Sequence, residues 1–242
     1  MRLLDSKKNY VSSLILVGAC LFLLGYYFKR TDQLDFYRIT RGITSFSFLT
    51  YVLLIHKGRS SSLISYYLLL CGIIGLFGLW FEQANFRILI IVLSAISIIV
   101  LAVYLSPKIK KKPLSPRFLI LTGLLTVLNA FLLYHFIEMI LVDEEMKGVF
   151  SVMILYALLV VFISLLVLVY NKIKSSRASM VFTMSWFALV VSEILRAAGY
   201  YEVGFDEVLV HTGQILFIVS NALLVYYTIV NESEKPSIVK YV

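Results

Sequence analysis

Charged residues, cysteine, histidine and proline are scarce in this 242-residue chain. Charged types make up 15% of it and hydrophobic types 60%, and there are only two cysteines, three histidines and four prolines. A soluble domain is roughly a quarter charged, so a chain this short has too few polar groups to cover a soluble surface. The composition therefore excludes a soluble enzyme, a soluble nucleic-acid-binding protein and a disordered scaffold.

Long apolar runs occupy most of the remaining sequence. The hydrocarbon core of a bilayer is about 30 Å thick, and a helix needs roughly 20 mostly apolar residues to cross it. The connections between the runs are short, so we expect one all-α domain over residues 1–242, a polytopic bundle of eight transmembrane helices. The expected spans are about 10–28, 36–56, 63–81, 86–105, 118–142, 149–170, 178–199 and 208–230.

The distribution of Lys and Arg predicts the orientation, because cytoplasmic loops are enriched in both. The N-terminus and the even-numbered loops hold fifteen of the 22 basic residues, the other side holds six, and Arg196 lies inside a span. Both termini are therefore expected in the cytoplasm. The protein itself is expected in a bacterial cytoplasmic membrane. Lys29, Arg30, Arg38 and Arg41 are the exception to this bias. The net charge of +8 is interpreted as a topology signal, and no nucleic-acid partner is expected.

Several polar side chains lie inside the expected spans, where ionisable groups are costly and mark candidate functional positions. Three pairs are spaced i,i+3 and so share a helix face. With Glu82 at the end of the third span, four helices place ionisable groups in one outer layer, which predicts a polar cavity in the outer leaflet. The alternative is that each group reaches interfacial water or is neutralised on its own helix. The residues are Glu82, His135, Glu138, Glu193, Arg196, His211, Gln214 and Asn221.

The spacing of glycine, and that of the potential metal ligands histidine and cysteine, lead to two further expectations. Gly72, Gly75 and Gly78 repeat every three residues, which favours close helix packing, with a groove for an acyl chain as the alternative. The histidines and cysteines do not have the spacing of a metal site, so no metal and no cofactor are expected.

The last two expected spans resemble the YhhN-like lysoplasmalogenase family of integral membrane proteins. Residues 178–186 (ASMVFTMSW) are similar to the family pattern G-A-x-L-F-x-x-S-D, and residues 211–216 (HTGQIL) with Ser220 are similar to A-Q-x-L-I followed by a serine. Residues 76–79 (LFGL) stand where the third span of the family ends in L-L-G-D. Span count and spacing extend the resemblance over most of the chain.

The resemblance implies cleavage of the vinyl ether bond of lysoplasmalogens, which requires an acid and a base. Leu79 and Trp186 replace both motif aspartates, and residues 94–95 (SA) lie near the position of a family histidine. The family mechanism is therefore not expected at these positions. Glu82 and Glu193, with His135 or His211 as the second titrating group, are the candidate catalytic replacements. The ligand-binding candidates are Arg196 as phosphate partner, Gln214, Glu138 and Asn221.

Two functions remain open from the sequence. The first is a divergent YhhN-like protein that binds a lysophospholipid- or ether-lipid-type membrane lipid and, if it is an enzyme, hydrolyses it. The second is a catalytically inactive subunit that contacts a membrane-protein partner or a second copy of the chain. The loss of both motif acids favours the second. A small transporter ranks last, because the four prolines lie outside the expected spans and no repeat is visible.

Overall fold

The computed structural model describes residues 2–55, 62–109, 114–140, 147–200 and 206–234, and every regular element in these ranges is a helix. The prediction of an all-helical chain is confirmed for these residues. The expected spans fall on α-helices, except that the third, 63–81, also covers a short 3₁₀ helix, and the ends of 36–56 and 118–142 lie outside the described residues. The helices are α1 (Arg2–Arg30), α2 (Leu34–Ile55), α3 (Ser62–Phe77), η1 (Gly78–Trp80), α4 (Ala84–Leu105), η2 (Ser106–Lys108), α5 (Pro116–Ile140), α6 (Lys147–Lys174), α7 (Arg177–Tyr200) and α8 (Asp206–Ser233).

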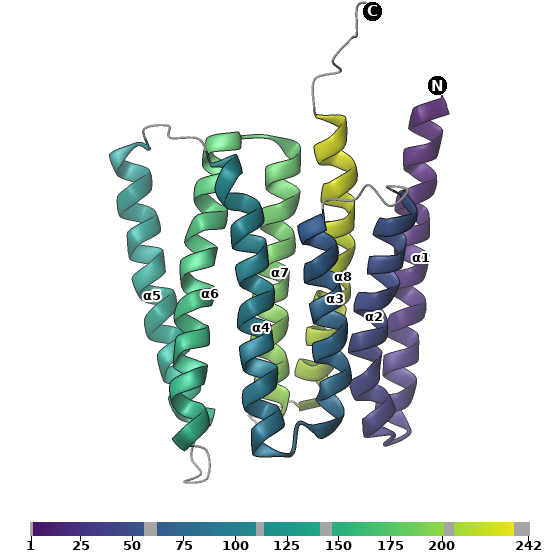
Figure 1. Cartoon of the computed structure of the whole chain (residues 1–242), viewed down its shortest axis with the longest axis vertical. Coiled ribbons are helices and arrows are strands. Elements are labelled where there is room, and N and C mark those ends of the chain that lie inside the picture. The colour runs from purple at the N-terminus through teal and green to yellow at the C-terminus, as the bar shows by residue number, and fades with distance from the viewer. Residues whose placement is uncertain (1, 56–61, 110–113, 141–146, 201–205, 235–242) are drawn as a thin grey trace, which may run out of the picture.

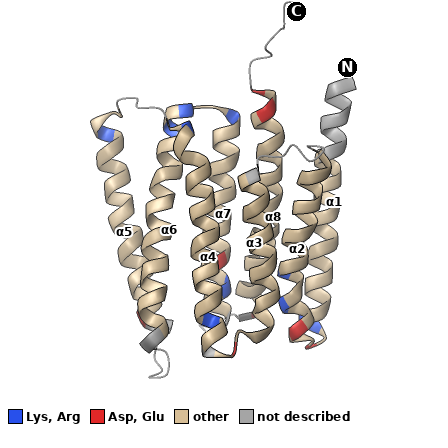
Figure 2. Ribbon diagram, viewed as in Figure 1, with Lys and Arg blue, Asp and Glu red and all other residues tan. Residues whose placement is uncertain are grey.

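Length and apolar composition identify a multi-pass membrane protein. Seven of the helices are long and apolar enough to cross a bilayer, and α2, with Asp35, Arg38 and Arg41 in its first turns, is the exception. Large apolar side chains cover the outside, with Leu54 73% and Ile120 72% exposed. Lys, Arg, Asp and Glu gather toward the two ends of the bundle and leave its middle largely uncharged (Figure 2).

Six helices form a closed ring. In order around the ring, α2, α3, α4, α6, α7 and α8 each pack against the next, and α8 also packs against α2. Outside the ring, α1 packs against α2 and α8, and α5 packs chiefly against α6 (Figure 1). Successive helices run antiparallel, so α1 begins and α8 ends at the same end of the bundle. We call this the terminal end and the opposite one the far end.

Glycine brings α2 and α3 into backbone contact. A Cβ atom on Gly75 would lie 2.3 Å from the Gly42 nitrogen, and one on Gly72 would lie 2.6 Å from the Phe46 ring. Beside Gly78 the nearest atom is 4.0 Å away, so this glycine is not required for packing. The prediction of close packing is therefore confirmed for Gly72 and Gly75.

Small hydroxyl residues set the register of α7 against α8. Ser185 Oγ donates to the Ser220 carbonyl at 2.8 Å, and Ser220 Oγ donates to the Ser185 carbonyl at 2.8 Å. Two turns further along, Ser192 Oγ donates to the Gly213 carbonyl at 2.7 Å. Because these hydroxyl groups bond across the seam, the two helices pack closely and hold the far-end half of α7 in a defined orientation.

A tyrosine cluster fills the terminal half of the ring. Tyr227 is fully buried, and its hydroxyl lies 3.2 Å from the hydroxyl groups of Tyr104 and Tyr170. Lys108 Nζ donates to the same hydroxyl at 2.9 Å. The ring of Phe182 packs at 5.0 Å from that of Tyr227. The interior of the ring is therefore filled at the terminal end by hydrogen-bonded aromatic side chains.

Removing the central hydroxyl of this cluster should destabilise the bundle. Tyr227→Phe leaves the buried Tyr104 and Tyr170 hydroxyls without this partner, and we expect the free energy of unfolding to fall by about 1–3 kcal/mol. Equilibrium unfolding in mixed micelles measures the change. Tyr134→Phe on α5, where the tyrosine is 45% exposed, is the control and should leave stability unchanged. Equal stability of the two variants would contradict this description of the cluster.

Candidate functional site

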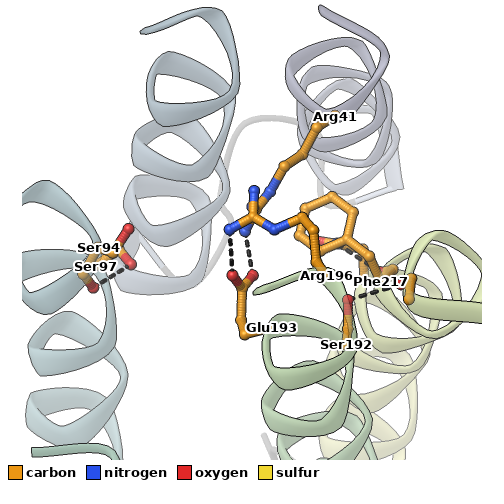
Figure 3. Close-up of polar contacts among 9 residues, drawn as sticks. Arg41, Ser94, Ser97, Ser192, Glu193, Arg196 and Phe217 are labelled. Carbon is orange, nitrogen blue, oxygen red and sulfur yellow. Dashed lines mark hydrogen bonds and ion pairs between the residues drawn. The ribbon is translucent and has the colours of Figure 1, made fainter. Parts of the chain in front are cut away.

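An ion cluster joins α2 to α7 in the far-end half of the ring. Arg41 Nη2 donates to Oε1 of Glu193, and Arg196 Nη2 donates to Oε2 of the same carboxylate at 2.6 Å (Figure 3). Arg41 lies seven residues after the start of α2 and Glu193 seven residues before the end of α7. At a rise of 1.5 Å per residue, both are about 10 Å from the far end of the bundle.

The cluster is largely buried and carries excess positive charge. The Arg41 side chain is 18% exposed and that of Glu193 is 21% exposed, whereas Arg196 is 46% exposed. Nε and Nη1 of Arg41 are buried without a hydrogen-bond partner, and its guanidinium lies 4.7 Å from the centre of the Phe217 ring. Two guanidinium groups share one carboxylate, so the formal charge is +1. A buried charge without full compensation is costly, and an anion at Arg41 would supply the missing compensation.

A small cavity, lined by both polar and apolar side chains, adjoins Arg41 and Glu193. Its volume is about 20 Å³, enough for one water molecule and too small for a lipid headgroup in this conformation. One of its serines, Ser97, donates to the Ser94 carbonyl at 2.8 Å. Residues from α2, α3, α4, α6 and α7 line the cavity: Arg41, Tyr67, Cys71, Ile74, Ser94, Ser97, Ile98, Tyr156, Leu189 and Glu193.

Glu82 lies at the far end but outside this cavity. Arg38, three residues before Arg41 on α2, donates to the Glu82 carboxylate, which is 62% exposed. This pair links the start of α2 to the segment after η1. Because Glu82 does not line the cavity with Glu193, the structure does not bring the two candidate catalytic carboxylates into one site.

His135 and Glu138 pair with each other on α5. His135 Nδ1 lies 3.2 Å from Glu138 Oε2, and both side chains are more than half exposed. Since α5 packs outside the ring, chiefly against α6, this pair faces away from the Arg41 cavity.

The candidates on α8 lie mainly in its seam with α1. The His211 ring packs 5.0 Å from that of Tyr26, and the Gln214 amide lies directly over Gly25. Asn221 is 1% exposed and donates to the Phe217 carbonyl at 2.8 Å. Atoms His211 Nδ1, Gln214 Oε1 and Asn221 Oδ1 are buried without a partner.

The polar residues singled out from the sequence thus occupy four separate places in the structure. Glu193 lines the cavity and Arg196 binds Glu193, while the other candidates lie on α5, in the α1–α8 seam or beside Arg38. Sequence reasoning missed Arg41 as a site residue. The signal was its position as an exception to the charge bias, since a basic residue inside an expected span, on the side predicted to be non-cytoplasmic, requires an acidic partner in the fold.

Neither residue that stands in place of the motif acids in the resemblance, Trp186 or Leu79, can transfer a proton, and Trp186 serves packing. Trp186 is 2% exposed, and its indole Nε1 donates to Ser164 Oγ at 2.8 Å, which ties α7 to α6. Leu79 lies in η1, and its side chain has no group for proton transfer. Among the described residues, no cluster of three or more His, Cys, Asp or Glu side chains could hold a metal ion.

Comparison of the chain with protein-family models, with curated proteins and with solved structures finds no match. Any function is therefore argued from the chemistry of the site.

Proposed function

We propose that this protein binds a lysophospholipid- or ether-lipid-type amphiphile through its anionic headgroup at the Arg41 cavity. The observation that carries the proposal is the buried Arg41 guanidinium, with two unpartnered nitrogen atoms in a cluster of net charge +1. Arginine binds phosphate and carboxylate groups through forked donors, and such charge-assisted hydrogen bonds are among the stronger ones in proteins. We further propose that the chain is a divergent YhhN-like protein.

The proposed topology has eight crossings with both termini in the cytoplasm of a bacterial cell. Supporting it, α2 takes a full place in the ring between α3 and α8, and α1 begins at the end where α8 finishes (Figure 1). The basic residues described at that end include Lys108, Arg117, Lys172, Lys174 and Arg177. In this orientation the Arg41 cavity lies about 10 Å inside the outer end of the bundle, near the depth where lipid headgroups meet acyl chains.

Binding without turnover is the form that the geometry favours. A general acid must donate a proton to the vinyl ether, whereas both oxygens of Glu193 accept hydrogen bonds from guanidinium groups. The remaining candidate acids and bases, Glu82, His135 and His211, lie outside the cavity lining. Hydrolysis would therefore require a rearrangement of the site.

The binding proposal predicts a selective effect of Arg41. In purified detergent-solubilised protein, Arg41→Gln should weaken binding of 1-acyl lysophosphatidylethanolamine at least tenfold, the loss of about one charge-assisted hydrogen bond. Native mass spectrometry or thermophoresis measures the affinity, and monoacylglycerol with the same acyl chain is the neutral comparison ligand.

The matched control is Arg87→Gln, which removes the same charge at the same end. Arg87 donates to the backbone carbonyls of Phe81 and Glu82 and does not line the cavity. Its substitution should change the affinity less than twofold. Equal binding of the two lipids, or full binding by Arg41→Gln, would refute the proposal.

A second candidate function is that of a partner or assembly subunit. The observation that favours it is the half-exposed His135–Glu138 pair on α5, since polar groups on an outward face of an apolar helix are costly in lipid. A stoichiometric membrane-protein partner, or a second copy of the chain, that dissociates when this pair is replaced would support this function.

A further inference from the structure

We propose that the Glu193 carboxylate occupies the anion-binding position beside Arg41 in the ligand-free protein, and that the ligand displaces it from Arg41. In the ligand-free protein its carboxylate takes the place of the anionic group, and on binding it remains on Arg196 alone. This inference rests on the proposed function, because it describes how the same site is filled. The ligand group that would displace Glu193 has two terminal oxygen atoms on one phosphorus or carbon atom.

The carboxylate of Glu193 is divided between two arginines of different kinds. Oε2 pairs with Arg196, three residues further along the same helix, so this pair does not depend on α2. Oε1 pairs with Arg41 across the ring, from a helix far away in the sequence. The second contact can therefore be exchanged while the first persists.

Charge balance favours the exchange. Without a ligand, Arg41 and Arg196 share one carboxylate, and the cluster carries a formal charge of +1. A monoanionic headgroup on Arg41, with Glu193 kept by Arg196, gives two positive and two negative charges. Because Arg196 is 46% exposed and Arg41 only 18%, the inner arginine gains more from a second anion.

The geometry of the occupant indicates the class of ligand. Glu193 bridges the two guanidinium groups with its two carboxylate oxygens. A phosphodiester presents the same pair of terminal oxygens, whereas an alcohol, an ester or an amide does not. Nε and Nη1 of Arg41 are two further donors that such a group would satisfy.

The small size of the cavity agrees with a site in which the Glu193 side chain fills the anion-binding position. Its volume of about 20 Å³ admits one water molecule beside Arg41. Movement of the Glu193 side chain toward Arg196 vacates the space next to the guanidinium. The small cavity is therefore the closed form of the site.

Glu193→Gln provides the test, because glutamine keeps the size of the side chain and removes the competing charge. Affinities are measured in detergent for lysophosphatidylethanolamine, a fatty-acid carboxylate and neutral monoacylglycerol of equal chain length. We expect about tenfold tighter binding of at least one of the two lipids that carry an anionic group, and no change for monoacylglycerol. Tightening for only one of these two lipids assigns the phosphodiester or the carboxylate as the ligand group. The control is Asp35→Asn, an exposed acid at the same end of α2, which should leave all three affinities unchanged.

Weaker or unchanged binding by Glu193→Gln would overturn the exchange, since weaker binding means that Glu193 attracts a cationic part of the headgroup. If this variant cannot be purified, Glu193→Asp retains the charge but shortens the reach, and about threefold tighter binding is expected. Unchanged affinity in Glu193→Asp would then overturn the inference. If Arg41→Gln still weakens binding, the proposed function stands without the exchange, and if no variant binds any lipid, both fail.

Discussion

Gly75→Ala is expected to lower the free energy of unfolding by about 3 kcal/mol or more, at the upper end of the range for overpacked sites. The added Cβ would lie 2.3 Å from the Gly42 nitrogen and 2.5 Å from its Cα. These are backbone atoms, so a change of rotamer cannot relieve the overlap, and α2 must move away from α3. Gly42 follows Arg41 directly, so the displacement also moves the guanidinium away from Glu193.

Two measurements test this expectation. Equilibrium unfolding in mixed micelles reports the stability, and lysophosphatidylethanolamine binding reports whether Arg41 still reaches its site. Gly123→Ala on α5 is the control, because a Cβ there meets no atom within 4 Å. It should cause no loss of stability, since alanine is the better helix former. If Gly75→Ala and Gly123→Ala behave alike, α2 and α3 are not in backbone contact.

The second large effect concerns the ion pair between Arg41 and Glu193. Glu193→Leu alone leaves the buried Arg41 charge without its partner, and we expect a loss of about 3–5 kcal/mol, as for other broken buried pairs. Arg41→Met alone should lose less, because Glu193 keeps Arg196. The double variant places two apolar side chains in contact and should recover most of the loss, within about 1 kcal/mol of the wild type.

An ion pair at the same end whose carboxylate is exposed supplies the matched control. Arg38 pairs with Glu82, whose side chain is 62% exposed, so Arg38→Met and Glu82→Leu should each change stability by less than about 1 kcal/mol. Additive effects at Arg41 and Glu193 would show that the two charges are not coupled in the folded protein. The stable double variant also lacks the anion site, so it should bind no lysophospholipid.

The positions of the helices along the chain could be predicted from the sequence, but which helices pack against each other could not. A backbone in a bilayer must satisfy its hydrogen bonds within each helix, so every crossing requires its own apolar run. The sixth expected span, 149–170, accordingly lies within α6, Lys147–Lys174, one of the seven helices apolar enough to cross a bilayer. The Glu193–Arg196 pair was equally visible, because residues three apart share a helix face.

The polar residues near the far end show that the sequence predicts depth along a helix but not the direction of a side chain. Counting residues along each helix gives the depth of His135, Glu193 and His211, and all three do lie toward the far end. It does not give the direction in which each side chain points around the bundle. His135 therefore lies on the outside and His211 in the α1–α8 seam, although the sequence allowed all three to share one cavity.

The scarcity of charge, by itself, determined that this chain is a multi-pass helical membrane protein. Hydropathy is a local property, and the bilayer selects for it segment by segment. Only the tertiary structure decided which of the few charges meet. Arg41 and Glu193 are 152 residues apart, and they pair because the glycine contact between α2 and α3 and the serine seam between α7 and α8 hold their helices in one ring. The basic residues that contradicted the predicted topology thus include the one at the centre of the candidate site.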